Sequence, residues 1–299
     1  MATGIVFGPA DATADFLRYA PMVESSETAQ SVYREVAAAS GVEVDQLLAR
    51  PAPHVGAVVL RSLRQMAAML SIAKILEADF GRAQVYGGIS LGELAALHMA
   101  GAASVEMVVD LLRVRHLPDT SLDEAICFTF VPTLDDWRYY DDVDSMSVSV
   151  DYGPVFDGTG RMIMLSGLRS TLESMRTAGP AELQVVDRDM ADQAYHSPFR
   201  EPGRRRLSSF LVENPLSDPM APVLTAVPGL QKASTGGKAT EALLKSETHP
   251  LSVPVLVEGV EKFGLDKVHA VSSFLGELRI RFGAPTDYYG DRWLAYRFG

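Results

Sequence analysis

The sequence is poor in cysteine, in basic residues and in long apolar runs. Cys127 is the one cysteine among 299 residues, which excludes an internal disulfide framework and a thiolate-rich metal site. The 27 Lys and Arg are outnumbered by 38 Asp and Glu, and the formal charge of -11 would repel phosphate backbones and anionic lipid. We therefore expect neither a nucleic acid nor a membrane as a partner.

The chain also lacks targeting and membrane-spanning patterns. No segment approaches the roughly 18 apolar residues that a spanning helix needs. The first residues, Met1 to Phe7, contain no basic region of the kind that begins a signal peptide, so we expect a cytoplasmic protein. At 47% hydrophobic and 22% charged residues, the chain can bury a sizeable core.

The spacing of apolar residues divides the chain into three parts. Strand and helix patterns alternate in the first and last parts, whereas the middle part is rich in strand patterns. We therefore expect a large α/β domain of residues 1–117 and 190–299, with a parallel sheet core, that carries an inserted α+β subdomain over residues 118–189. The expected segments include strands at 4–7, 84–86, 125–131, 145–150, 161–166, 183–186 and 268–271, and helices at 26–39, 55–80, 91–101, 105–115, 169–178, 239–247 and 253–263.

The sequence Gly88-Ile89-Ser90-Leu91-Gly92 is a G-x-S-x-G motif at a strand-to-helix turn, which is the setting of a nucleophile elbow. Such a turn is too tight for side chains beside the serine, so it needs the two glycines. Ser90 would then stand at the N-terminus of a helix, where free backbone N–H groups favour a developing oxyanion. The alternative interpretation is a glycine-rich turn with an N-capping serine.

A serine nucleophile needs a general base, and His196 is the best candidate. It follows the strand-rich segment directly, where the chain re-enters the large domain, and Pro198 restricts the backbone beside it. His98 lies about two helical turns after Ser90, so we expect it to be structural. A lone histidine is more often structural than catalytic, and the pairing with Ser90 is what favours His196. The remaining histidines are His54, His116, His249 and His269.

These segments resemble the malonyl-CoA:acyl-carrier-protein transacylases and the stand-alone acyltransferases of polyketide synthesis. The segment Gly88–Glu93, with the Leu- and Ala-rich helix after it, is similar to the active-site segment of that family. His196-Ser197-Pro198 reproduces the context of its catalytic histidine, and Arg115 falls where the family has an arginine on the next helix. The resemblance covers most of the chain and is strongest at residues 85–115 and 194–200.

The resemblance implies a fold and a catalytic set. The fold would be a hydrolase-like α/β domain with an inserted ferredoxin-like subdomain. Ser90 and His196 would form the catalytic dyad, and the backbone N–H groups of Leu91 and Ala10 would form the oxyanion hole. The backbone carbonyl of Ser246, just before His249-Pro250, would orient the histidine in place of an aspartate.

The resemblance also implies substrates. Arg115 would hold the free carboxylate of a malonyl group, although it could instead form an ion pair with Asp110 or Glu106 on a surface helix. Tyr195 stands where the family commonly adjusts substrate size, and its bulk favours malonyl. No resident cofactor is implied, because the coenzyme A thioester is a substrate and the acceptor protein carries the phosphopantetheine.

The sequence departs from the family pattern at four places. The loop after the first strand is Gly8-Pro9-Ala10-Asp11-Ala12 in place of Gly-Gln-Gly-Ser-Gln. Ile89 replaces the usual histidine before the nucleophile and is expected to make the pocket wall more apolar. Arg61 corresponds roughly to a glutamine on the buried helix. Residues 271–276 replace a late Gly-Pro-Gly segment.

Four arginines, Arg200, Arg204, Arg205 and Arg206, form a basic cluster on this acidic chain. Carrier proteins are acidic, and both coenzyme A and phosphopantetheine carry phosphate, so the cluster could steer such partners toward the site. The alternative is a solvated helix face with internal ion pairs.

The sequence therefore predicts an acyltransferase. It would move a malonyl-type acyl group from a thioester donor such as acyl-CoA to the thiol of an acyl carrier protein, in polyketide, antibiotic or fatty-acid biosynthesis. The alternatives are transfer of a larger acyl group between two carrier proteins, hydrolysis of acyl-carrier thioesters, and a non-catalytic scaffold that binds carriers. An ordinary α/β-hydrolase would place its histidine near the C-terminus, unlike His196.

Overall fold

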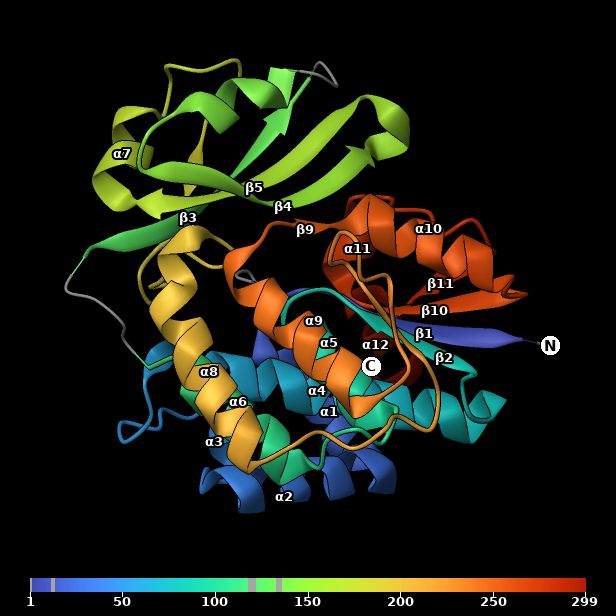
Figure 1. The fold of residues 1–299 in the computed structure, drawn as a ribbon. Helices are drawn as coiled ribbons and strands as arrows, with labels where there is room; N and C mark the ends of the chain where they lie inside the picture. The colour runs from blue at the N-terminus through green and yellow to red at the C-terminus, as the bar shows by residue number, and fades with distance from the viewer. Residues whose placement is uncertain (1, 12–13, 118–121, 133–135) are drawn as a thin grey trace.

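A computed structural model describes residues 2–11, 14–117, 122–132 and 136–299. In this part of the chain, the larger sheet has six strands, of which all but the edge strand β8 run parallel to their neighbours. The strands are β1 (Thr3–Phe7), β2 (Val85–Gly88), β7 (Val223–Thr225), β8 (Lys232–Ala233), β10 (Lys267–Val271) and β11 (Thr286–Tyr288). Their order is β11-β10-β1-β2-β7-β8, with the first strand of the chain in the middle (Figure 1).

The second sheet has the order β6-β3-β5-β4-β9 and is antiparallel except where β9 joins β4. Its strands are β3 (Glu124–Val131), β4 (Met146–Val155), β5 (Gly160–Leu168), β6 (Gln184–Val185) and β9 (Leu251–Ser252). Four of them come from the inserted segment, and β9 comes from the last part of the chain. The predicted fold class, a parallel α/β core with a smaller α+β part, is confirmed. The predicted domain limits stay a prediction, and residues 118–121 at one of them lie outside the described residues.

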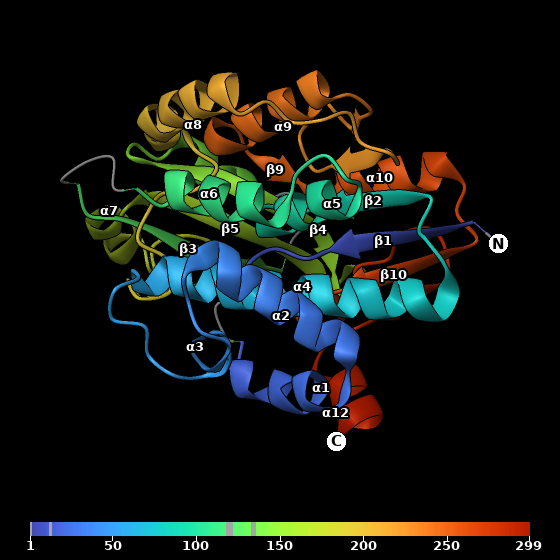
Figure 2. The same cartoon turned by 90° about the horizontal axis from the view of Figure 1, so that it is seen from below.

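Helices cover the larger sheet on one face, as Figure 2 shows from below. The helices that supply this layer are α2 (Glu27–Ser40), α4 (Ala57–Phe80), α5 (Leu91–Met99), α6 (Val105–Arg115), α8 (Glu201–Glu213) and α9 (Gly236–Thr248). Alternate residues of a strand point to opposite faces, so Ile5 and Phe7 pack in this core while Val6 packs in a second one. The second core lies between the other face of the sheet, α10 (Val253–Phe263) and the smaller sheet.

Several element boundaries follow from local chemistry. Ser26 and Ser104 cap α2 and α6 through their side chains, and α2 ends at Gly41 in a left-handed conformation. The remaining helices are α1 (Ala20–Ser25), α3 (Val44–Leu48), α7 (Arg169–Ser174), α11 (Ser273–Glu277) and α12 (Asp291–Phe298). No helix in the described part of the chain is both long and apolar enough to cross a membrane.

Two elements of the inserted segment, the strand β4 and the helix α7, end at other residues than predicted. β4 continues to Val155, five residues beyond the predicted end, because it stays paired with β5 through two register shifts. α7 ends at Ser174 rather than at residue 178. Both differences arise from pairing and packing that a short sequence window does not contain.

Gly92 is the point of closest approach between α5 and β1. A Cβ atom at Gly92 would lie 2.5 Å from the carbonyl oxygens of Gly8 and Phe7. We expect Gly92→Ala to destabilise the fold by about 1–3 kcal/mol, because this backbone clash exceeds the gain of up to ~1 kcal/mol in helix propensity. Urea unfolding followed by circular dichroism measures the difference.

Gly259 provides the matched control, because it lies inside α10 and an added Cβ atom would come no closer than 3.7 Å to any neighbour. Gly259→Ala should be neutral or stabilising by up to ~1 kcal/mol. Equal effects of the two substitutions would show that the contact between α5 and β1 is not tight.

Candidate active site

Ser90 stands on a sharp turn between β2 and α5. Its backbone has φ +57° and ψ -113°, which is a conformation that side-chain-bearing residues rarely adopt. Gly88 is required beside it, since a Cβ atom there would lie 2.1 Å from the carbonyl oxygen of Gly92. Leu91 is the first residue of α5, so its N–H has no acceptor within the helix. The turn has the geometry that the G-x-S-x-G motif predicts.

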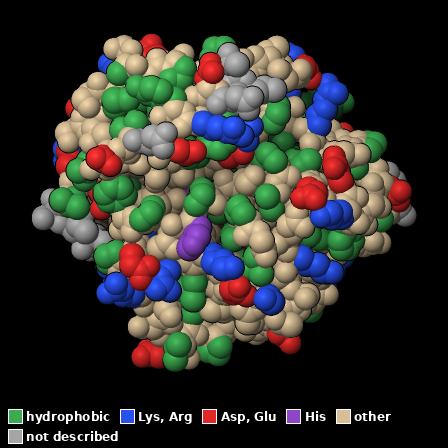
Figure 3. Space-filling model, turned by 45° about the horizontal axis from the view of Figure 1, so that its top comes forward, with side chains coloured by type: hydrophobic (Ala, Val, Ile, Leu, Met, Phe, Trp, Pro, Cys, Tyr) green, Lys and Arg blue, Asp and Glu red, His purple; other side chains and the backbone are tan. Residues whose placement is uncertain are grey.

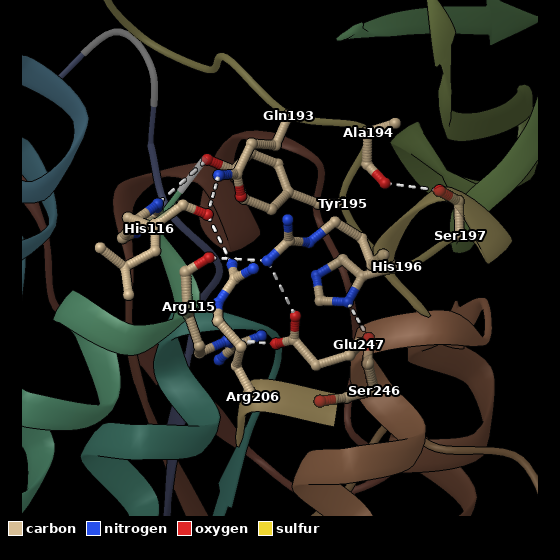
Figure 4. A network of polar contacts seen from close by, with 12 residues as sticks. Arg115, His116, Gln193, Ala194, Tyr195, His196, Ser197, Arg206, Ser246 and Glu247 are labelled. Atoms are coloured by element: carbon tan, nitrogen blue, oxygen red, sulfur yellow. Dashed lines mark hydrogen bonds and ion pairs between the residues drawn. The ribbon is translucent and has the colours of Figure 1, made fainter. Parts of the chain in front are cut away.

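His196 and Ser90 are hydrogen-bonded although 106 residues separate them, with 2.8 Å between Nε2 and Oγ. The other ring nitrogen, Nδ1, bonds to the backbone carbonyl of Ser246 near the end of α9 (Figure 4). A carbonyl oxygen only accepts, so Nδ1 carries the proton and Nε2 is left to accept from the Ser90 hydroxyl. His196 also has a positive φ of +54°, which directs the ring toward the serine.

The electrostatic surroundings keep His196 neutral at pH 7. Burial, together with a smaller contribution from the positive charge of Arg115, lowers the pKa of His196 to about 4. The hydrogen bond to the Ser246 carbonyl and the negative charge of Glu247 act in the opposite direction. A neutral imidazole beside a hydroxyl is the protonation state that a general base requires.

Arg115 lies at the end of α6 and is buried, with 9% of its side chain exposed. Its Nε atom is 2.5 Å from Oε1 of Glu247, whose side chain is 3% exposed. The alternative of a surface ion pair with Asp110 or Glu106 is wrong for Arg115, because its side chain turns inward. The ion pair with Asp110 is made by Arg113, at 3.3 Å.

Arg200 does not belong to a surface cluster, which corrects the sequence prediction. Its side chain is 1% exposed and donates to the backbone carbonyl of Arg115 at 2.6 Å. It also lies 3.3 Å from the Glu247 carboxylate, so Glu247 pairs with two guanidinium groups. Arg200 is the last residue of a short 3-10 helix, Pro198–Arg200, which begins two residues after His196. Its side chain is buried beside the site.

The other arginines of the predicted cluster lie on α8. Arg204 and Arg205 share the carboxylate of Glu201, at 2.7 and 3.2 Å. Arg206 donates to the backbone carbonyl of Leu117 at 2.7 Å. Figure 3 shows basic and acidic side chains interspersed on the face that it draws. These contacts fit the alternative of a helix face with internal ion pairs, although two arginines on one carboxylate leave a local positive charge.

The residues around Ser90 line one cavity. The volume that the centres of water molecules can occupy in it is about 90 Å³. Ser90, Leu91, Arg115 and His196 line it together with Ala10. The opposite wall comes from the smaller sheet and is mainly apolar, formed by Ile126, Phe128, Val150, Tyr152 and Met164.

Ile89 was expected on the cavity wall, and this prediction is wrong. Its side chain is fully buried in the second core and is not among the described residues that line the cavity. The reason is the alternation of side chains at the end of β2, which points Ile89 away from the direction of Ser90.

Gln65 on α4 holds the loop that contains Ala10. Its side-chain oxygen accepts from the Asp11 N–H at 2.8 Å, and its amide nitrogen donates to the Pro9 carbonyl at 3.1 Å. The family resemblance pointed to Arg61 on this helix as the counterpart of the family glutamine. Arg61 lines the cavity and donates to the Asp11 carbonyl at 3.2 Å. Gln65 is one turn further along and was missed. Ala12 of the same loop lies outside the described residues.

Tyr195 lines the cavity and is held by polar contacts. Its hydroxyl lies 3.2 Å from Nδ1 of His116, and Nε2 of His116 lies 3.2 Å from the Ser62 hydroxyl. Burial lowers the pKa of His116 to about 3, so the ring is neutral. Sequence reasoning counted His116 among the histidines and gave it no role, and it missed Glu247. The available signal was sequence position, because His116 directly follows Arg115 and Glu247 directly follows Ser246.

The histidine titration can be measured directly. We expect the His196 imidazole to titrate near pH 4 in a heteronuclear NMR titration, rather than at the ordinary pKa of about 6.5, because burial and Arg115 disfavour its charged form. The unfolded chain binds this proton at higher pH than the folded chain, so protonation should destabilise the fold as the pH falls from 6.5 toward 4.

The variant Arg115→Gln removes the second cause of the shift and should move the His196 midpoint upward. A wild-type midpoint near 6.5 would contradict the buried, neutral imidazole described above. A midpoint that does not respond to Arg115→Gln would contradict the contribution of Arg115.

Comparisons of the sequence found no matching family model and no matching curated protein. The fold, in contrast, matches solved structures over the full length. One is the malonyl-CoA:acyl-carrier-protein transacylase of Helicobacter pylori, with a TM-score of 0.82, 16% identity, and coverage of 100% of this chain and 97% of that chain. The malonyl-CoA:acyl-carrier-protein transacylase of Synechocystis gives a TM-score of 0.79 at 18% identity, with 97% of both chains covered.

A third match is a malonyl-transacylase solved in complex with its type II PKS acyl-carrier protein. It has a TM-score of 0.79, 16% identity, and coverage of 100% of this chain and 99% of that chain. The resemblance that the motifs suggested therefore extends to the whole structure. The chain has the fold of the malonyl-CoA:acyl-carrier-protein transacylases, with a hydrolase-like α/β core and a ferredoxin-like subdomain.

Proposed function

We propose that this chain is an acyltransferase that moves an acyl group from a thioester donor to the phosphopantetheine thiol of an acyl carrier protein through an acyl-enzyme on Ser90. The observation that carries this proposal is the 2.8 Å contact between Ser90 Oγ and His196 Nε2 in a lined cavity. The fold supports it, since transacylases with known structures share it over their full length. A non-catalytic scaffold would have no need for this contact.

The first half-reaction loads the serine. His196 Nε2 accepts the Ser90 proton while Oγ attacks the thioester carbonyl carbon, and the carbonyl oxygen becomes an oxyanion. When the oxyanion collapses, the carbon–sulfur bond breaks and the thiolate takes the proton from His196. The second half-reaction reverses the roles, because the carrier's thiol gives its proton to His196 and attacks the ester carbonyl.

Two backbone N–H groups are assigned to the oxyanion. Leu91 offers the first N–H of α5, where the helix dipole also favours negative charge. Ala10 lies on the cavity wall, in the loop that Gln65 holds from both sides. A single donor of this kind contributes about 3 kcal/mol to the transition state in other serine enzymes.

The dyad uses a carbonyl where a triad has a carboxylate. The Ser246 carbonyl sets the tautomer of His196 without adding a charge, so it stabilises the imidazolium less than an aspartate would. Glu247, the residue after Ser246 on α9, supplies part of the missing negative charge. Its carboxylate raises the pKa of His196 and so favours the imidazolium.

Arg115 bears on the choice of acyl group. From the sequence we expect a malonyl-type group whose carboxylate pairs with Arg115, and the position of Arg115 on the cavity wall supports a role in substrate choice. Tyr195 limits the size of the acyl group, since His116 and Asp192 hold its hydroxyl. The pairing of Arg115 with Glu247 and the apolar wall favour a second candidate, transfer of a larger uncharged acyl group between two carrier proteins.

An acyl carrier protein is the proposed partner, as in the solved complex of a related fold. We assign its docking to the exposed arginines of α8, Arg204 and Arg205, because together they outnumber their shared carboxylate on Glu201. We also retain the division into a large domain of residues 1–117 and 190–299 and a small one of 118–189, with the site between them.

Ser90 should become acylated. Incubation with acyl-CoA donors should add one acyl mass to the wild type and none to Ser90→Ala, and His196→Ala should slow loading about 10²–10⁴-fold because the general base is lost. Intact-mass spectrometry with rapid quenching measures both effects. Ser62→Ala is the control, since Ser62 lines the same cavity but contacts His116.

Full acylation of Ser90→Ala would contradict the proposal. The absence of an adduct with every acyl-CoA and acyl-carrier donor would contradict it as well. Rapid loss of the acyl group to water in the absence of a carrier would indicate a thioester hydrolase that uses the same dyad.

The carrier contact can be tested by charge reversal. Arg204→Glu with Arg205→Glu should raise the KM for an acidic carrier several-fold while self-acylation from acyl-CoA stays unchanged, and the effect should shrink with added salt. Arg176→Glu is the control, because Arg176 is exposed in the smaller domain and pairs with Glu182 there. Identical carrier kinetics at low ionic strength would leave the α8 arginines without a docking role.

A further inference from the structure

Glu247 places a carboxylate against Arg115 before any substrate is bound. It lies near the end of α9, opposite the end of α6, and the two side chains are 3% and 9% exposed. Their atoms approach to 2.5 Å, and both residues line the cavity that contains Ser90. Arg115 is therefore already paired, through Nε, with a carboxylate of the chain itself.

The carboxylate of Glu247 is ionised. Burial alone would raise its pKa, but Arg115 and Arg200 outweigh burial and hold the pKa of Glu247 below its ordinary value. A guanidinium group in a protein keeps its positive charge. The pair is therefore neutral as a unit at pH 7.

A second buried acidic group, Glu93, is influenced by the charge of this arginine. Glu93, one turn after Ser90 on α5, is 2% exposed, and burial raises its pKa to about 7. Arg115 lowers that pKa whereas Glu247 raises it, so the three groups act on one another. With a pKa of about 7, Glu93 is only partly ionised at pH 7, so it adds a partial negative charge to that of Glu247 beside Arg115 and Arg200.

A substrate carboxylate would approach an arginine that is already paired with Glu247. It would contact Arg115 but also face Glu247, and like charges in a desolvated site repel strongly. A buried charge without a partner of its own is strongly unfavourable. The uncharged part of an acyl chain meets no such penalty, because Ile126, Val150 and Met164 offer it an apolar wall.

We propose that Glu247 is a specificity-determining residue that occupies Arg115 and restricts the site to acyl groups without a free carboxylate. This inference rests on the acyl transfer proposed above and narrows its substrate class to uncharged acyl groups. The acyl chain then extends from Ser90 toward the apolar wall of the smaller sheet, and Arg115 serves as the structural partner of Glu247.

Donor competition on Ser90 tests the inference. Wild-type protein is mixed with equal concentrations of malonyl-CoA and one uncharged donor, first acetyl-CoA and then butyryl-CoA, and the two adducts are quantified by intact mass. We expect the wild type to load the uncharged group at least 10-fold faster. Glu247→Gln keeps the size of the side chain and removes its charge, so it should shift the ratio toward malonyl at least 10-fold.

Two further variants make the test specific. Glu247→Gln combined with Arg115→Gln should lose the gained malonyl loading, since the freed arginine is its cause. Asp151→Asn is the matched control, because Asp151 pairs with Arg161 through two bonds and is not among the described residues that line the cavity. It should leave the ratio unchanged, and circular dichroism checks that each variant is folded.

The outcomes separate this inference from the proposed function. A wild type that loads malonyl at least as fast as the uncharged donors overturns the specificity role of Glu247 and leaves acyl transfer intact. An unchanged ratio in folded Glu247→Gln overturns it equally. If Glu247→Gln does not fold, the wild-type ratio decides alone. Absence of loading from every donor sinks acyl transfer itself, and the inference with it.

Discussion

The close approach of α5 to the first strands determines where the reactive serine stands. Gly92 lies directly against the backbone of Phe7 and Gly8, and Gly88 lies directly against Gly92, at distances that exclude any side chain. The chain must therefore reverse within two residues, and Ser90 takes the strained backbone conformation that results. The strain is maintained because the parallel sheet and the helix are both fully packed around it.

The second determinant of the site is the group of buried charged residues beside His196. His196 is neutral because it is buried and because Arg115 disfavours its charged form, and it is oriented because the Ser246 carbonyl accepts from one nitrogen. Glu247 follows Ser246 on the same helix, so the residue that orients the base and the residue that pairs with Arg115 move together. Any shift of α9 would change the orientation of His196 and the pairing of Arg115 at the same time.

The local features of the site could be predicted from the sequence because they depend on short-range chemistry. The elbow follows from the spacing of two glycines around Ser90. The alternation of strand and helix patterns predicted the parallel core and the inserted part. The His196-Ser197-Pro198 segment identified the partner of Ser90 through a family resemblance, and the two side chains do meet.

The sequence by itself thus determined the fold class, the strained serine turn and the identity of the histidine that meets it. Only the tertiary structure decided the direction in which charged and apolar side chains point. Arg200 is buried, Ile89 faces the core, and Glu247 meets Arg115 across 132 residues, none of which periodicity or composition reveals. The physical reason is that a buried charge selects its partner by proximity in space and by desolvation, and both exist only once α6 and α9 have packed together.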